Sequence, residues 1–191
     1  MSSRLPVDRQ RIEQFLRRLG ERFRHPGRVY LVGGTTMVFE GFREQSIDID
    51  LTFQVAPSDH TEMIQAIREL KDQLALNVEE VSPADFIPLA QGYRERAVFV
   101  GRYGQIDVYH FDLYATALSK VARGTEEDLN DVLALLRAKR MDMALLEKYF
   151  AEIRPRVATE SLKQDVNQFD QNFQAVRRLW TAENSSSRGT L

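Results

Sequence analysis

The chain has 191 residues, of which 43 % are hydrophobic and 28 % charged, a composition typical of a soluble globular protein with one domain or one domain and a helical appendage. It contains no cysteine, which excludes disulfides, thiolate nucleophiles and sulfur-ligated zinc, so we expect a cytoplasmic location in a reducing compartment. The net charge of -2 argues against binding to nucleic acid by bulk electrostatics. Hydrophobic runs have only the length of strands, so we expect no membrane-spanning helix.

The first half of the sequence alternates between helical and strand patterns. Apolar residues from Val7 to Phe23 recur at helical spacing, and Pro26-Gly27 ends that helix. A buried strand over 28–32 then runs directly into Gly33-Gly34 and a short helix over 35–42. β-Branched runs, caps and turn residues predict the remaining elements of this half: a strand over 47–55, a helix over 60–76, a strand over 77–81, and a hairpin of strands over 96–100 and 105–111.

The second half is purely helical in pattern. Helices are predicted over 113–123, 125–139, 143–153 and 162–181, and a polar tail follows. This order predicts an α+β fold with a mixed β-sheet core flanked by helices and a helical C-terminal extension. We therefore expect a core over 1–112, a helical region over 113–182 and a disordered tail over 183–191.

Two aspartates on the predicted 47–55 strand carry the first chemical signal. Side chains alternate between the two faces of a strand, so Asp48 and Asp50 share one face while Ile49 and Leu51 point into the core. Two carboxylates this close repel each other unless a cation lies between them. Mg²⁺ prefers hard oxygen ligands, commonly one or two carboxylates together with the phosphates of a substrate, so the pattern indicates a magnesium site. A solubility device on an edge strand is the alternative.

The diglycine turn before these aspartates has a matching physical rationale. Without side chains, Gly33 and Gly34 let phosphate oxygens approach backbone N–H groups, and Thr35 and Thr36 add hydroxyl donors. A third carboxylate on an adjacent strand would complete a two-metal site. Asp107, between Ile106 and Val108, has that local pattern, and Asp112 competes with it but is interpreted equally well as a helix cap. A glycine pair after a strand is, taken alone, more often only a turn.

The glycine turn and the aspartate strand together resemble a pattern of a known superfamily. Gly33-Gly34-Thr35, followed by Asp48-Ile49-Asp50-Leu51, resembles the signature of nucleotidyltransferases with the DNA polymerase β type fold. The stretches over 43–46 and 118–131 resemble the bacterial nucleotidyltransferase-like group that includes the AbiEii-type toxins of toxin–antitoxin systems. Within that group the chain is most similar to short stand-alone proteins of unassigned function, also over 86–89 and 92–96, and the resemblance runs from about Val29 to Leu136.

The resemblance implies a nucleotidyltransferase-type core that moves a nucleoside monophosphate from an NTP bound with Mg²⁺ or Mn²⁺ to an acceptor. Carried over by position, the residues fall into three groups. The implied metal ligands and catalytic residues are Asp48, Asp50 and Asp107; the implied NTP-binding residues are Gly33, Gly34, Thr35, Lys120 and Arg123; and the acids matching the group's Asp-x-x-Asp segment are Asp128 and Asp131.

Several alternatives stay open at this stage. Lys120 with Asp131 is interpreted either as a phosphate-binding group or as a structural ion pair between helices, and Asp128 as a site residue or a first-turn acid favoured by the helix dipole. The arginines of the first helix form a solvated face or contact an RNA acceptor. Trp180, with Phe169 and Phe173, belongs to a core or an interface stripe.

Two functional hypotheses follow. The first is a metal-dependent nucleotidyltransferase acting on RNA such as tRNA, on a protein or on a small molecule, and serving as the toxin of a toxin–antitoxin pair with an antitoxin partner. The second is a non-catalytic module of the same fold, such as an antitoxin-like partner or a nucleotide sensor. A complete set of metal ligands favours the enzyme, and a missing third carboxylate favours the module.

Overall fold

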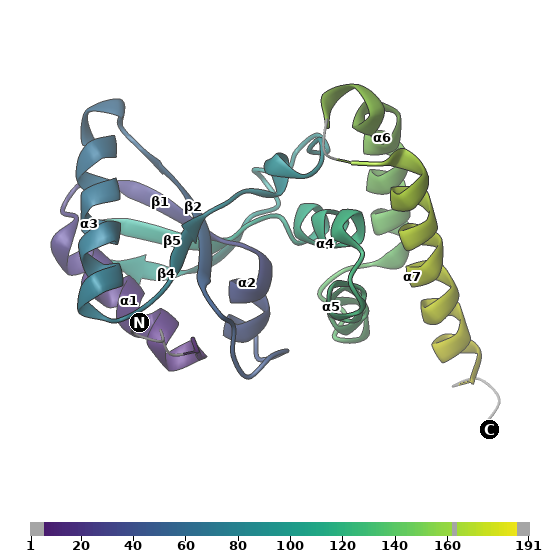
Figure 1. Cartoon of the computed structure of the whole chain (residues 1–191), viewed down its shortest axis with the longest axis horizontal. Coiled ribbons are helices and arrows are strands. Elements are labelled where there is room, and N and C mark those ends of the chain that lie inside the picture. Colours follow the sequence, from purple (N-terminus) through teal and green to yellow (C-terminus); the bar gives the residue numbers. More distant parts are fainter. Residues whose placement is uncertain (1–5, 162–163, 187–191) are drawn as a thin grey trace. The chain divides into compact units, whose positions relative to one another are not determined.

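The structure, a computed structural model, describes residues 6–161 and 164–186, and it divides the chain into two compact units. The first unit is formed by residues up to Ser82 together with Arg94–Asp112. The second is formed by Pro83–Tyr93 together with residues from Leu113 on. The chain therefore passes between the units three times, and the short segment 83–93 belongs with the helical half (Figure 1).

The first unit is an α+β sandwich built on a mixed five-stranded sheet. Its strand order is β3-β2-β1-β5-β4, with β1 antiparallel to β2 and parallel to β5, β2 parallel to β3, and β4 antiparallel to β5. Its elements are α1 (Arg9–Arg22), β1 (Gly27–Leu31), α2 (Gly33–Phe39), β2 (Ile49–Val55), the 3-10 helix η1 (Pro57–Asp59), α3 (His60–Gln73), β3 (Val78–Glu80), β4 (Val98–Tyr103) and β5 (Ile106–His110).

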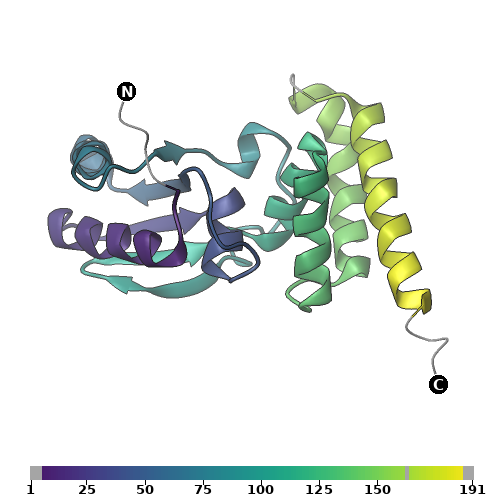
Figure 2. The same cartoon turned by 60° about the horizontal axis from the view of Figure 1, so that its bottom comes forward.

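One face of this sheet is covered by helices. Asp8 caps α1 by accepting a hydrogen bond from the Arg11 backbone N–H, and the apolar stripe of α1 then packs beside α3 over the sheet (Figure 1 and Figure 2). Alternation along the strands supplies the other half of this core, with Leu31, Leu51 and Val108 fully buried. The side chains between them point to the opposite face, where they stay partly or largely exposed.

The second unit is helical. It contains the 3-10 helix η2 (Pro83–Asp85), α4 (Leu113–Arg123), α5 (Glu126–Arg137), α6 (Met143–Glu160) and α7 (Val166–Ser186), and Figure 2 shows the four long helices running alongside one another. The ring of Phe150 stacks on Phe173 with centroids 3.8 Å apart and lies 4.9 Å from Phe169. Ion pairs between Arg154 and Asp170 and between Arg177 and Glu147 hold α6 to α7.

Hydrogen bonds hold segment 83–93 to α6 and to Ser161, the residue that follows α6. Ser161 Oγ donates to the Phe86 carbonyl at 2.6 Å, and Arg156 donates to the Leu89 carbonyl at 3.0 Å. The backbone N–H of Gln91 donates to Glu152 at 2.7 Å. These contacts explain why the segment goes with the second unit, although the sequence predicts one uninterrupted core over 1–112.

The α+β class, the mixed sheet flanked by helices and the helical C-terminal extension are confirmed. Two helices extend past their predicted C-terminal ends. Helix α6 continues through Pro155 to Glu160, since Ile153 and Val157 are both fully buried and keep this stretch packed. Helix α7 continues to Ser186, past the expected start of the tail at residue 183, and residues 187–191 lie outside the described residues. Within the described ranges, every helix is too short or too polar to cross a bilayer.

Candidate active site

The diglycine turn and the aspartate strand meet as the sequence predicts. Gly33 has a φ of +55°, in the left-handed region that favours glycine, and a Cβ atom there would lie 2.8 Å from Asp50 Oδ2. A Cβ atom on Gly34 would lie 2.9 Å from Ser46 Oγ. The absence of both side chains therefore lets the Asp50 carboxylate and the Ser46 hydroxyl lie directly against the backbone that begins α2.

The two threonines after the turn are fully buried and hold this arrangement together. The Thr35 hydroxyl oxygen accepts a hydrogen bond of 2.7 Å from the Asp50 backbone N–H. The Thr36 hydroxyl donates to the Leu31 carbonyl at 3.0 Å. Both hydroxyls thus connect α2 to the strands that flank it, and since Thr35 accepts from Asp50, its own proton remains available for donation.

Three carboxylates gather beside the turn. Asp48 directly precedes β2, Asp50 lies in β2, and the register of the parallel β2–β3 pair places Glu79 opposite Asp50. Ligand oxygens of these three acids all lie within 4.8 Å of one another. The Asn77 amide donates to Asp48 at 3.4 Å and to Glu79 at 3.2 Å, which holds the two acids on a common donor. Clustered hard oxygen donors of this kind fit a divalent cation such as Mg²⁺.

The electrostatics of the cluster favour a bound cation. Burial raises the pKa of Asp48 above its ordinary value, the nearby Glu79 charge raises it further, and the hydrogen bond from Asn77 opposes both effects. The ionised carboxylate is therefore held in surroundings that disfavour its charge. A divalent cation between the acids would remove this repulsion, so the donor set fits the metal that the sequence predicts.

Asp107 requires a correction. Asp107 lies opposite Arg28 in the β1–β5 pairing. Arg28 precedes Val32 by four residues, and the backbone N–H of Val32 donates to the backbone carbonyl of Asp50. Four residues of strand correspond to about 13 Å. The Arg102 guanidinium instead donates two hydrogen bonds to the Asp107 carboxylate, of 2.7 Å to Oδ1 and 3.1 Å to Oδ2. These bonds hold the pKa of Asp107 below its ordinary value. The structure does not bring Asp107 to the other two aspartates.

Glu79, which sequence reasoning missed, lies in that third position instead. The strand that carries Glu79 is predictable from the sequence, but its parallel pairing with β2 is a long-range contact without a local signal. The competing Asp112 is 1 % exposed and receives two hydrogen bonds from Arg96, so it ties β4 to the end of β5 rather than joining the cluster.

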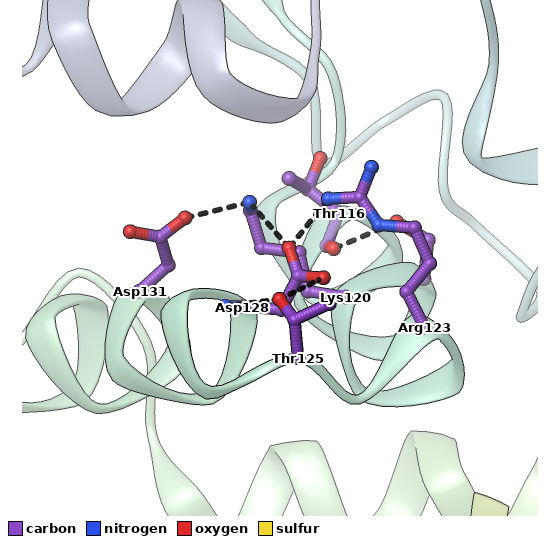
Figure 3. A network of polar contacts seen from close by, with 7 residues as sticks. Thr116, Lys120, Arg123, Thr125, Asp128 and Asp131 are labelled. Carbon is purple, nitrogen blue, oxygen red and sulfur yellow. Dashed lines mark hydrogen bonds and ion pairs between the residues drawn. The ribbon is translucent and has the colours of Figure 1, made fainter. Parts of the chain in front are cut away.

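A second polar cluster lies in the helical unit (Figure 3). Lys120 on α4 is 1 % exposed, and its Nζ lies 2.6 Å from Asp131 Oδ2 and 3.3 Å from Asp128 Oδ1, both on α5. Arg123 also pairs with Asp128, while 42 % of its side chain stays exposed. Thr125 caps α5 by accepting from the Asp128 N–H at 3.1 Å, and its hydroxyl donates back to the Asp128 carboxylate at 2.9 Å.

The contacts of this cluster bear on two alternatives that the sequence leaves open. Lys120 and Asp131 form an interhelical ion pair, and Asp128, in the first turn of α5, contacts both Lys120 and Arg123. Thr116, one turn before Lys120 on α4, is fully buried, and in the described part of the chain its hydroxyl has no hydrogen-bond partner. Figure 3 shows this hydroxyl near the head groups of Lys120 and Arg123.

The predicted site residues therefore fall into two groups. The first unit brings together Gly33, Gly34, Thr35, Asp48 and Asp50, joined by Glu79, and the second unit brings Lys120 and Arg123 together with Asp128 and Asp131. Phe169 and Phe173 are core residues, whereas Trp180 is only partly buried.

Comparison with known proteins identifies the family of the chain. The model of a protein family described as "Nucleotidyltransferase of unknown function (DUF6036)" matches residues 10–180, which span both units. Neither the comparison with curated proteins nor the comparison with solved structures gave a match. The match covers most of the chain, so the protein belongs to this family and with it to the nucleotidyltransferases.

Proposed function

We propose that this nucleotidyltransferase transfers a nucleoside monophosphate from a metal-bound NTP to an acceptor. The observation that carries the proposal is the cluster of Asp48, Asp50 and Glu79 beside the Gly33-Gly34 turn. A third carboxylate within 4.8 Å of the first two supports an enzyme over a non-catalytic module of the same fold, because two-metal nucleotidyl transfer needs a complete ligand set.

In this proposal each part of the first unit has a distinct task. Asp48, Asp50 and Glu79 hold Mg²⁺ or Mn²⁺, which when bound supplies positive charge to the triphosphate and to the attacking oxygen. The Gly33-Gly34 backbone receives phosphate oxygens. The fully buried Thr35 fixes the backbone of Asp50, so the phosphate contacts and the metal ligands are held in one geometry.

The proposed transfer is a single displacement at the α-phosphorus. A bond forms between the acceptor hydroxyl oxygen and the α-phosphorus, and the bond between the α-phosphorus and the bridging oxygen of the β-phosphate breaks. Pyrophosphate leaves with the electron pair, and the acceptor proton passes to a carboxylate of the cluster and then to water.

Within the helical unit, the resemblance implies that Lys120 and Arg123 bind phosphate. Arg123 keeps 42 % of its side chain exposed and is the group we assign to phosphate contact. Lys120 is buried against two acids, so we assign it to positioning: it holds α5 against α4 and keeps Asp128 in place for Arg123.

The proposed role of the protein in the cell rests on the resemblance alone. The toxin of a toxin–antitoxin pair, with tRNA or a protein as acceptor and an antitoxin as partner, is the role that the AbiEii-like stretches suggest. Growth arrest on expression of the wild type, and not of an Asp48→Asn variant, would support this role; equal growth of both would contradict it.

The proposed activity is tested by incubating the protein with each of the four α-labelled NTPs, Mg²⁺ or Mn²⁺, and total RNA or cell extract. Label transferred by the wild type and by Glu80→Gln, but not by the Asp48→Asn/Asp50→Asn double variant, is the expected result. Glu80→Gln is the matched control because Glu80 is an exposed strand carboxylate whose side chain points away from the cluster. No transfer, together with no metal-dependent NTP binding, would leave the non-catalytic module as the function.

A further inference from the structure

The sheet face that faces away from α1 and α3 carries an ordered pattern of side chains, and we call it the open face. Successive residues on one side of a strand are two positions apart, so the strand registers divide this face into rows about 6.6 Å apart. Among the described residues, the open face includes Glu79 of β3, Asp50, Thr52 and Gln54 of β2, Arg28 and Tyr30 of β1, Asp107 and Tyr109 of β5, and Phe99 and Arg102 of β4.

The middle row is aromatic. Tyr30 lies opposite Tyr109 on β5, and Tyr109 lies opposite Phe99 on β4, so three rings follow one another across three strands. The rings of Tyr30 and Tyr109 stack with centroids 5.6 Å apart, and Phe99 meets Tyr109 edge-on at 5.4 Å. Tyr30 and Tyr109 are half-buried, while Phe99 is 58 % exposed.

Cross-strand packing alone does not account for this row. Stacked aromatic pairs stabilise a sheet, and this explains the contact between Tyr30 and Tyr109. It does not explain why Phe99, at the edge of the row, leaves more than half of its surface in water while the apolar residues of the opposite face are buried. Exposed aromatic rings in a group mark a surface that binds something with an apolar, planar face.

The row on one side of the aromatic row is basic. Arg28 lies opposite Asp107, and Arg102 lies opposite Asp107 from the other strand, with 69 % of the Arg102 side chain exposed. These residues line a hollow of about 660 Å³ that also takes in Gln54 and Gln105. Only Arg102 forms a described ion pair with Asp107, and the Arg28 guanidinium hydrogen-bonds to Tyr30. Two guanidinium groups and one carboxylate leave a net positive charge in the hollow, and guanidinium groups are the side chains best suited to phosphate.

The row on the other side contains Asp50 of the carboxylate cluster. Asp50 precedes Thr52 by two residues on β2, so it lies on the same face, one row from the rings. The open face therefore presents, in order, a proposed metal ligand, planar aromatic surface and phosphate-binding charge.

We propose that the open face binds the acceptor as a single-stranded nucleic acid, with unpaired bases against Phe99 and Tyr109, phosphates at Arg28 and Arg102, and the reacting end at the carboxylate cluster. The inference rests on the proposed function for its reaction, but the binding surface stands on its own geometry. A single strand fits because stacking on side-chain rings needs unpaired bases. A folded protein partner would use the rings but has no need for two arginines in register beside them.

Binding is measured by fluorescence anisotropy with labelled strands of about 12 nucleotides, as RNA and as DNA, each single-stranded and as a duplex. We expect the single strand to bind more tightly than the duplex, and Phe99→Ala to weaken binding about tenfold, with Phe99→Trp restoring it. Arg102→Gln should reduce the dependence of log Kd on log salt by about one unit. The RNA and DNA arms decide which of the two strands is preferred.

Matched controls separate this surface from general charge. Arg17→Gln removes an exposed arginine from α1, on the covered side of the sheet, and should leave binding unchanged. Leu179→Ala truncates an exposed apolar side chain in the other unit and should also have no effect. Equal loss of binding in Arg17→Gln and Arg102→Gln would overturn the proposal, because it would reduce the interaction to bulk charge.

The outcomes also distinguish this inference from the proposed function. An Asp48→Asn/Asp50→Asn variant that binds the strand but transfers no label supports the surface independently of the chemistry. Label transfer to a small molecule or a protein, without binding of either strand, would overturn the inference and leave the nucleotidyl transfer standing. Wild-type affinity in Phe99→Ala would likewise overturn it and assign the aromatic row to another partner.

Discussion

The backbone N–H of Asp50 donates a 2.7 Å hydrogen bond to the hydroxyl oxygen of Thr35, and both groups lie where α2 meets β2. This bond links the proposed phosphate-binding turn to the proposed metal ligands. One buried hydroxyl thus sets the position of a carboxylate without contacting that carboxylate.

We predict that Thr35→Val weakens both the fold and the activity. The substitution keeps the shape of the side chain but leaves a buried N–H without its acceptor, which should cost about 1 to 3 kcal/mol of unfolding free energy. Thr35→Ser keeps the oxygen and should restore metal binding and transfer. Thermal melts together with Mn²⁺ titration measure both effects, and a Thr35→Val variant as active as Thr35→Ser would contradict the positioning role.

The carboxylate cluster predicts that Glu79, and not Asp107, is needed for metal binding. Glu79→Gln should weaken Mn²⁺ binding at least tenfold by calorimetric titration, since it removes one of three charged ligands. Asp107→Asn should bind the metal as the wild type does. Glu80→Gln is the second control, because Glu80 is an exposed neighbour on the same strand whose side chain points to the other face. If Asp107→Asn weakened Mn²⁺ binding more than Glu79→Gln does, Asp107 rather than Glu79 would be the third metal ligand.

Asp48 should be a stability liability in the metal-free protein. Its raised pKa means that its contribution to stability is fully present below the unfolded-state value of 3.8 and is lost as pH rises through the folded-state pKa. Asp48→Asn should therefore melt higher than the wild type at neutral pH, by about 1 to 3 °C. Mg²⁺ should reverse the order, since a ligand at a hundredfold excess over its Kd stabilises the wild type by about 2.7 kcal/mol. An Asp48→Asn variant that melts lower without metal would contradict this.

Asp128 should have the opposite pH dependence. Burial raises the pKa of Asp128, but Lys120, Arg123 and Thr125 together outweigh burial and hold the pKa below 3.8. Its stabilisation is thus present above about pH 4 and lost as pH falls through the lowered pKa. Asp128→Asn should lose about 3 kcal/mol at neutral pH, because Lys120 stays buried with one partner fewer.

Denaturant unfolding at several pH values measures this difference. The difference in unfolding free energy between wild type and Asp128→Asn should become smaller as the pH falls below about 4. Glu126→Gln, an exposed first-turn acid of the same helix, is the control and should show a small gap. A gap for Asp128→Asn that is constant with pH would show that its charge does not stabilise the helical unit.

The local parts of this structure were predictable because short-range physics determines them. The diglycine turn before the Asp48-Ile49-Asp50 strand needs only backbone freedom and side-chain alternation, both of which are evident in consecutive residues. The cap of α5 by Thr125 and the hairpin turn at Gly104 are equally local, the latter with a φ of +60°.

The parts that escaped prediction depend on contacts between distant segments. Glu79 reaches Asp50 through a parallel pairing, and parallel strands are joined by long crossovers whose register no adjacent residue specifies. Asp107 has the right local pattern, but β5 pairs with β1 rather than β2, and the register displaces it from the cluster. Segment 83–93 packs on α6, some sixty residues later, so its membership of the second unit was equally hidden.

The three chain crossings between the units limit how this protein is divided, in the laboratory or by recombination. A fragment ending at Asp112 would keep segment 83–93 but lose α6. The segment would then lose its hydrogen bonds to Glu152, Arg156 and Ser161, and Ile87, which is 2 % exposed, would lose the helical unit with which it belongs. A fragment beginning at Leu113 would lack the segment altogether. A single breakpoint therefore cannot separate the helical unit intact, because that unit includes a stretch of sequence that interrupts the first unit.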